Sequence, residues 1–176
     1  RSSDLHPSAH ADVAATALSR GAFEYQGQKC SAASRAYLPS NLAEAIKAKL
    51  VADVKSFKVG TTEEFGNFVN AVIDERAFDK IAGFIEQAKN DTSCKILVGG
   101  TYDKTEGYFI QPTVIETTDP KYLTMCEEIF GPVLSIVRVK SFDEGVDLIN
   151  SGAFGNGTAI FTNDGGAARR FQNEIE

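Results

Sequence analysis

The chain has 176 residues, of which 43% are hydrophobic and 24% are charged, and its formal net charge is −6. This composition is ordinary for one globular domain that is large enough to bury its own core. The acidic balance argues against nucleic acid and membrane as partners, and no apolar run approaches the length of a membrane span.

The first half of the chain is rich in helical patterns. Small apolar residues at helical spacing predict a helix over 11–18. A second helix should begin after Pro39, with Asn41 and Glu44 as a capping pair. The apolar stripes of the second and third helices are expected to be Leu42, Ile46, Leu50, Val54 and Phe57, and Phe78, Ile81, Ala82, Ile85 and Ala88.

The second half contains most of the strand signals. Residues 95–100 predict a short buried strand that ends in a Gly-Gly turn. Residues 108–115 read as extended, and Pro112 indicates an edge or a bulge there. Residues 133–139 give the strongest strand pattern of the chain, and 155–162 predict another strand that follows a glycine-rich turn.

Two further helices are expected near the C-terminus. Ser141 and Glu144 form a capping-box pattern ahead of the apolar face Phe142, Val146 and Ile149. Asn163 and Asp164 are candidate caps for a last helix that carries Ala168, Phe171 and Ile175. The alternation of helices and strands predicts an α/β fold, with a mainly parallel sheet and helices on both faces.

The three cysteines are Cys30, Cys94 and Cys126, and their odd number and wide spacing fit neither a disulfide framework nor a zinc site. His6 and His10 lie four residues apart without a third ligand nearby, so we expect no metal. Cys94 and Cys126 are interpreted as structural. A reducing compartment is therefore expected, either the cytoplasm or, in a eukaryote, the mitochondrial matrix.

Cys30 stands out by its neighbours, because Gly27 precedes it and small residues follow it, so a ligand can approach the backbone closely. Lys29 would favour the thiolate, the reactive form of a cysteine. The residues alone leave two interpretations open, a catalytic nucleophile and a small buried apolar side chain.

The segment 127–132, Glu-Glu-Ile-Phe-Gly-Pro, is the second unusual pattern. It predicts either a solvated acidic turn that leads into a strand or a loop that presents a carboxylate and an aromatic ring to a ligand. A carboxylate there can accept hydrogen bonds from a ribose diol, as acidic residues do in other dinucleotide sites.

Together the two segments resemble the aldehyde dehydrogenase superfamily. Gly27-Gln28-Lys29-Cys30 is similar to the nucleophile motif of that family, and 127–132 is similar to its Glu-Glu-Ile-Phe-Gly-Pro motif. Cys30 and Glu128 lie 98 positions apart, which fits the layout of the family. The resemblance covers nearly the whole chain.

The finer resemblance divides the chain. The segments 23–35, 71–74 and 107–109, with His6 to Ala9 upstream, look like the 1-pyrroline-5-carboxylate dehydrogenase subfamily, which oxidises glutamate 5-semialdehyde to glutamate in proline breakdown. From about Ser135 onward, and most clearly over 154–162, the chain is more similar to methylmalonate-semialdehyde dehydrogenases, which transfer the acyl group to coenzyme A. The exact aldehyde therefore stays open.

The resemblance implies a role for each matching residue. Cys30 would attack the aldehyde carbon, with its own backbone N–H as one oxyanion donor. Glu128 would hold the nicotinamide ribose of NAD, and Phe130 would line the nicotinamide pocket. Ser31 would help to bind the substrate carboxylate.

Family members are much longer than this chain. The resemblance implies that residues 1–176 are the nucleophile-bearing part of the catalytic domain, without the N-terminal cofactor domain and the C-terminal oligomerisation segment. The second oxyanion donor and the general base would lie in the missing part, so we expect the piece alone to be inactive. Homo-oligomers are what the family implies for the full-length protein, with a small aldehyde as substrate.

Overall fold

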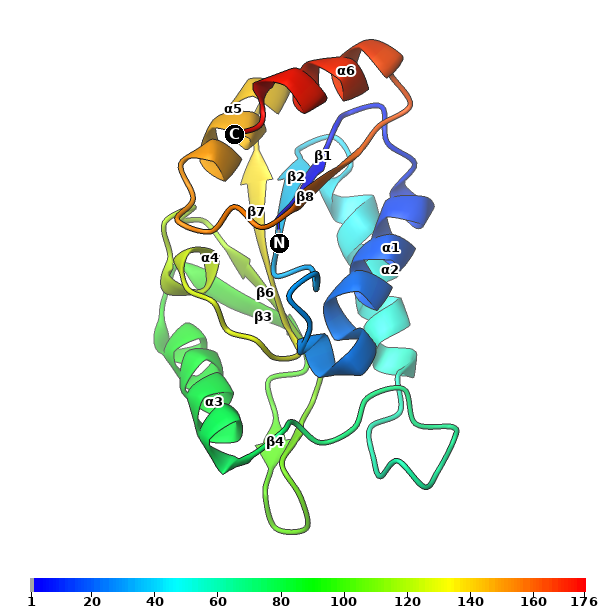
Figure 1. Ribbon diagram of the computed structural model, residues 1–176, viewed down its shortest axis with the longest axis vertical. Helices are drawn as coiled ribbons and strands as arrows, with labels where there is room; N and C mark the ends of the chain where they lie inside the picture. The colour runs from blue at the N-terminus through cyan, green and yellow to red at the C-terminus, as the bar shows by residue number, and fades with distance from the viewer. Residues whose placement is uncertain (1) are drawn as a thin grey trace.

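The structure is a computed structural model that describes residues 2–176, and its centre is a six-stranded sheet (Figure 1). The strand order is β3-β6-β7-β2-β1-β8, and every neighbouring pair is parallel except β3 with β6. The bounds are β1 Ser2–Leu5, β2 Arg35–Pro39, β3 Cys94–Val98, β6 Thr113–Thr117, β7 Val133–Val139 and β8 Thr158–Phe161. The expected α/β fold with a mainly parallel sheet is confirmed.

Helices cover both faces of this sheet (Figure 1). The helices α1 (Ala11–Phe23) and α2 (Ala43–Ser56) lie on one face, where they bury Leu38, Leu134 and Ile136. The other face carries α3 (Glu75–Asn90), α4 (Leu123–Cys126) and α5 (Phe142–Asn150), and α6 (Gly165–Glu174) packs beside α5. A short 3-10 helix, η1 (Glu24–Gly27), follows α1, and β4 (Tyr102–Asp103) pairs with β5 (Phe109–Ile110) outside the main sheet.

The strongest periodic signals are confirmed. The strand over 133–139 has the predicted bounds, and the predicted inner face of α3 is buried. The Gly-Gly turn is also present, since Gly99 and Gly100 have φ angles of 80° and 83°. In α5, Ser141 Oγ accepts a hydrogen bond from Glu144 N at 3.1 Å, whereas the Glu144 carboxylate binds Lys140 N instead of closing the capping box.

One capping prediction was wrong and another is confirmed for one of its two candidates. The helix α2 begins at Ala43 without a side-chain cap, because Asn41 donates to Pro7 O at 3.2 Å and Glu44 pairs with Lys47 and Arg138. At the last helix only Asp164 is the cap, with Oδ1 accepting from Gly166 N and Ala167 N. The predicted last-helix residue Ile175 lies just past the end of α6.

Several strand predictions need correction. The structure adds β1 and β2, two neighbouring strands inside the sheet, which the sequence patterns did not indicate because they contain Asp4, Arg35 and Pro39. The strand predicted over 95–100 is only half buried, since β3 is the antiparallel edge of the sheet. The extended run 108–115 is interrupted at Gln111 and Pro112, and the last strand begins at Thr158.

Within residues 2–176, no helix is both long enough and apolar enough to cross a bilayer.

Candidate active site

The segment that carries Cys30 begins with three residues in the left-handed region of backbone space. Tyr25, Gln26 and Gly27 have φ angles of 56°, 58° and 65°, which turn the chain sharply after α1. Such a conformation is costly for residues other than glycine and persists only where the surrounding structure enforces it. The turn sends Cys30 out to an exposed position just before β2.

The two motifs meet at Gly27. A Cβ atom at this position would lie 2.3 Å from Gly131 O, so only glycine lets the two backbones touch. On the other side of the contact, a Cβ at Gly131 would lie 2.4 Å from Ile81 Cδ1 of α3. Phe130, just before Gly131, also has a positive φ of 59°. Glycine at position 27 is therefore explained by the close approach of the two loops, and glycine at position 131 by the packing of Ile81 from α3 against it.

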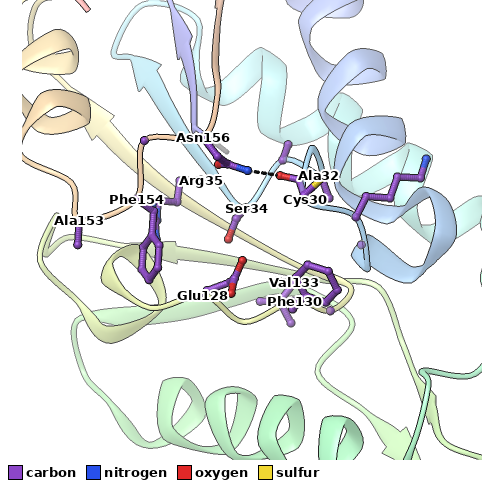
Figure 2. Close-up of a pocket in the computed structure, with 15 residues that line it drawn as sticks. Cys30, Ala32, Ser34, Arg35, Glu128, Phe130, Val133, Ala153, Phe154 and Asn156 are labelled. Carbon is purple, nitrogen blue, oxygen red and sulfur yellow. Dashed lines mark hydrogen bonds between the residues drawn. The ribbon is translucent and has the colours of Figure 1, made fainter. Parts of the chain in front are cut away.

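A cavity of about 310 Å³ lies beside this contact. Its walls come from residues of the segments 27–35, 128–133 and 153–156, and they include Cys30, Glu128 and Phe130 (Figure 2). These segments precede or begin β2, β7 and β8, so the cavity lies at the amino-terminal ends of parallel strands. Three of the four predicted site residues thus line one cavity.

Ser31 is the exception among the predicted residues. It is exposed and does not line the cavity, whereas Ser34 does. The hydrogen bond from Ala32 N to Lys29 O, 3.1 Å long, closes a β-turn with Cys30 and Ser31 at its two central positions. At the tip of such a turn, neighbouring side chains point in different directions, so Cys30 faces the cavity without Ser31 beside it.

The two lysines near the cavity, Lys29 and Lys80, are both bound to acidic segments. Lys29 Nζ lies 3.5 Å from Glu24 Oε2, which offsets the positive charge expected beside the thiol. The pKa of Glu24 is lowered, first by its hydrogen bond with Arg20 and further by Lys29. Lys80, from α3, donates to Glu128 O at 2.6 Å and so holds the backbone of the acidic loop.

Arg35 is a buried cation at the inner wall of the cavity. It is 4% exposed, its Nη2 donates to Glu127 O at 3.4 Å, and its Nε has no hydrogen-bond partner within residues 2–176. Its guanidinium lies 5.5 Å from the centroid of the Phe154 ring, which covers it. The acidic loop and the loop before β8 are therefore both in contact with one buried arginine.

The other cysteines and the histidines lie away from this cavity. Cys94 is half buried against the α3 cluster, as expected for a structural residue. Cys126 is exposed, contrary to its interpretation as structural, and its thiol donates to Lys121 O at 3.4 Å. His6 precedes α1 and His10 is at its N-cap position without a side-chain capping bond, and residues 2–176 contain no cluster of three metal-ligating side chains.

Four residues of the site were missed by the reasoning from sequence. Arg35 and Lys80 lie in stretches that were interpreted only as motif flank and helix surface. Phe154 and Asn156 come from a loop more than 120 positions after Cys30, and Asn156 Nδ2 donates to Cys30 O at 2.6 Å (Figure 2). Only the fold brings that loop to the nucleophile segment.

Comparison with known proteins agrees with this arrangement. The chain is 51% identical over 132 residues to the mitochondrial delta-1-pyrroline-5-carboxylate dehydrogenase of Dictyostelium discoideum, covering 75% of the chain and 24% of that protein. It is 42% identical to the rat mitochondrial protein of the same name, covering 91% of the chain and 29% of that protein. The chain therefore spans about a quarter to a third of the length of these relatives.

Solved structures show the same fold. The delta-pyrroline-5-carboxylate dehydrogenase of Mycobacterium tuberculosis matches with a TM-score of 0.92 and 36% identity over 98% of this chain and 32% of its own. The methylmalonate-semialdehyde dehydrogenase of Oceanimonas doudoroffii matches with a TM-score of 0.93 and 34% identity over 99% of this chain and 37% of its own. The model of the aldehyde dehydrogenase family matches residues 5–176. The chain belongs to the aldehyde dehydrogenase family.

Proposed function

We propose that residues 1–176 form the nucleophile-bearing part of the catalytic domain of an NAD-dependent aldehyde dehydrogenase that oxidises glutamate 5-semialdehyde to glutamate in proline breakdown. The observation that carries the proposal is the cavity in which Cys30, Glu128 and Phe130 meet, although they come from loops about a hundred positions apart. The identity to 1-pyrroline-5-carboxylate dehydrogenases of several organisms supports the choice of aldehyde.

Cys30 is the proposed nucleophile. Its thiolate attacks the aldehyde carbon, a C–S bond forms, and negative charge develops on the former carbonyl oxygen. The backbone N–H of Cys30 is the proposed donor to that oxygen, and such donors act most strongly where charge develops. Loss of a hydride from the same carbon leaves a thioester, and water then breaks the C–S bond to release the acid and regenerate the thiol.

Glu128 and Phe130 are the proposed contacts for the nicotinamide half of NAD. The Glu128 carboxylate lines the cavity, is exposed there, and is free to accept hydrogen bonds from a ribose diol, because Lys80 binds the Glu128 backbone oxygen. Phe130 is 41% exposed and lines the same cavity, so its ring offers a flat apolar surface. NAD held by Glu128 and Phe130 would supply the hydride acceptor for the sulfur-bound carbon.

Ser31 is proposed to help bind the substrate carboxylate at the mouth of the site, since it lies beside Cys30 but outside the cavity wall. The full-length protein is proposed to be a homo-oligomer of the cytoplasm, or of the mitochondrial matrix in a eukaryote. The relatives from Dictyostelium discoideum and rat are mitochondrial by name.

A second candidate is oxidation of methylmalonate semialdehyde with transfer of the acyl group to coenzyme A. The observation that favours it is the loop before β8, which lines the cavity through Phe154 and Asn156 and resembles that subfamily. The solved methylmalonate-semialdehyde dehydrogenase matches 99% of the chain. In this case coenzyme A, and not water, would attack the thioester.

The experiment that tests both candidates is NADH formation by the full-length protein with glutamate 5-semialdehyde or methylmalonate semialdehyde, with and without coenzyme A. The control is Cys30→Ala. NADH that forms from glutamate 5-semialdehyde without coenzyme A and is lost in Cys30→Ala supports the first candidate. NADH that requires coenzyme A and methylmalonate semialdehyde supports the second, and NADH that persists in Cys30→Ala contradicts both.

A further inference from the structure

The β-turn that carries Cys30 is held from outside by a single side chain. The peptide between Cys30 and Ser31 is the central peptide of this turn, and its carbonyl oxygen accepts a hydrogen bond from Asn156 Nδ2 at 2.6 Å (Figure 2). The other hydrogen bond of the turn, from Ala32 N to Lys29 O, is internal. Among residues 2–176, Asn156 is the hydrogen-bond partner that connects residues 29–32 to a distant segment.

The central peptide is the part of a β-turn that is free to rotate. Type I and type II turns differ mainly by a rotation of this peptide, and the closing hydrogen bond is the same in both. A bond to the central carbonyl therefore selects one orientation. Cys30 is exposed, so few packing contacts are available to do the same.

The loop that supplies Asn156 is itself attached to the sheet. Gly157 O, one residue after Asn156, accepts a hydrogen bond from Ser2 N of β1 at 3.3 Å, and β8 begins at Thr158. The Asn156 side chain thus connects the carbonyl group of Cys30 to the edge of the sheet through hydrogen bonds. The link spans 126 positions of sequence.

We propose that Asn156 is a positioning residue: its bond to Cys30 O fixes the 29–32 turn against the loop before β8, so that the thiol and the backbone N–H of Cys30 face the cavity in one orientation. This inference rests on the proposed function of Cys30 as nucleophile. The loop before β8 then affects the reaction through the geometry of the nucleophile, in addition to lining the cavity.

Two reactions of the same thiol separate positioning from simple exposure. With an activated aryl ester, the Cys30 thiolate attacks the carbonyl carbon, negative charge appears on the carbonyl oxygen, and aryloxide leaves to give a thioester. With iodoacetamide, the thiolate displaces iodide and no oxyanion forms. Acylation requires the thiol and the N–H of Cys30 to reach one carbonyl group in the cavity, so it depends on the orientation of the turn, whereas alkylation requires only an accessible thiol.

The test compares Asn156→Asp with Asn163→Asp in the whole chain. Both asparagines are exposed, both donate Nδ2 to a distant backbone oxygen, and Asn163 binds Ser8 O at 2.9 Å beyond the opposite end of β8. The ester and iodoacetamide rates at Cys30 are measured by mass spectrometry, with exposed Cys126 as the internal reference. We expect Asn156→Asp to lower the acylation rate about tenfold and the alkylation rate less than twofold, and Asn163→Asp to leave both unchanged.

The outcomes distinguish the two proposals. If wild-type Cys30 is acylated no faster than Cys126, the proposed function of Cys30 fails. If wild-type acylation is selective and Asn156→Asp retains it, or lowers both rates equally, the positioning role is wrong.

A second measurement covers the charge that Asp introduces and the case in which Asn156→Asp does not fold. Asn156→Ala removes the donor without adding charge, and amide hydrogen exchange reports directly on the turn. We expect exchange within 28–33 to rise about fivefold while exchange in β7 stays at the wild-type rate, because one hydrogen bond is lost locally. Unchanged exchange within 28–33, or an equal rise in β7, would overturn the proposal.

Discussion

The two faces of the central sheet differ in how they treat polar groups. The face under α1 and α2 is apolar, and Glu116 on that side is paired with Lys47 at 2.9 Å. The opposite face buries Asp4, Arg35 and Ser135, and each has at least one buried polar atom without a hydrogen-bond partner within residues 2–176. The strand register places these three side chains on one side of β1, β2 and β7.

The two faces have different roles: the apolar face supports the fold, and the polar face contributes to the candidate site. Helix α1 leads directly into the turn that carries Cys30, so the well-packed face fixes the position of the nucleophile segment. The face with unpartnered polar groups includes Arg35, which lines the cavity. Buried polar groups without partners are costly, and they concentrate at functional sites more than in a supporting core.

The largest expected effect is on the apolar face. Leu38, in the middle of the sheet, is fully buried, and Leu38→Ala should lower the free energy of unfolding by about 2–5 kcal/mol because it removes apolar contacts and leaves a cavity. Urea denaturation measures the change. The exposed Val13, on α1, provides the control, and Val13→Ala should alter stability by less than about 0.5 kcal/mol. A similar small effect at Leu38 would mean that this face is not the rigid support.

The second effect is on the polar face and depends on pH. Burial raises the pKa of Asp4 from its ordinary value of 3.8 to about 7. Because the folded state resists ionisation, stability is highest below the ordinary value and is lost as the pH rises from about 4 to 7. Three pKa units correspond to roughly 4 kcal/mol. We expect Asp4→Asn to remove most of this loss, so that it is the more stable protein at pH 8.

The measurement for Asp4 is the free energy of unfolding at pH 4, 6 and 8 for wild type and variant. The difference between the two proteins isolates Asp4 from other titrating groups. A difference that does not grow with pH would show that Asp4 has a partner or is solvated in solution.

The third effect concerns Glu116 on the apolar face, whose pKa is lowered where that of Asp4 is raised. Burial raises the pKa of Glu116, but the hydrogen bonds and charges of Lys47 and Arg138 together lower it by more. The net pKa of Glu116 therefore lies below its ordinary value of 4.5. Stability from this pair is therefore present above the ordinary value and lost as the pH falls through the folded pKa. Glu116→Gln should cost about 2 kcal/mol at pH 7, since it leaves Lys47 largely buried without its main counter-charge.

The same urea titrations test Glu116. The cost of Glu116→Gln should shrink as the pH approaches 3, opposite to the trend at Asp4. Equal trends at the two carboxylates would contradict the assignment of a paired and an unpaired face.

These contrasts also show which parts of the molecule were predictable. The strand over 133–139 and the inner face of α3 follow directly from apolar periodicity, which depends only on local sequence. The strands β1 and β2 were not predicted, because they contain the buried charged residues Asp4 and Arg35, which interrupt the apolar pattern of a buried strand. In the site, Cys30, Glu128 and Phe130 lie in recognisable motifs, whereas Asn156 reaches Cys30 only through the parallel pairing of β8 with β1.

The smallest effect concerns Ser135, which lies on the polar face in β7. Its hydroxyl is fully buried and has no hydrogen-bond partner within residues 2–176, while its backbone N–H binds Ser34 O at 3.0 Å. Ser135→Ala keeps that backbone bond and removes the unpartnered hydroxyl, so it should be neutral or stabilising by about 1 kcal/mol. The matched change Ala36→Ser buries a new hydroxyl on the apolar side of β2 and should destabilise by about 1–3 kcal/mol. Thermal unfolding of the two variants measures both signs. A destabilised Ser135→Ala would mean that the hydroxyl has a partner, such as an ordered water beside Arg35, and that the polar face is better satisfied than its protein contacts indicate.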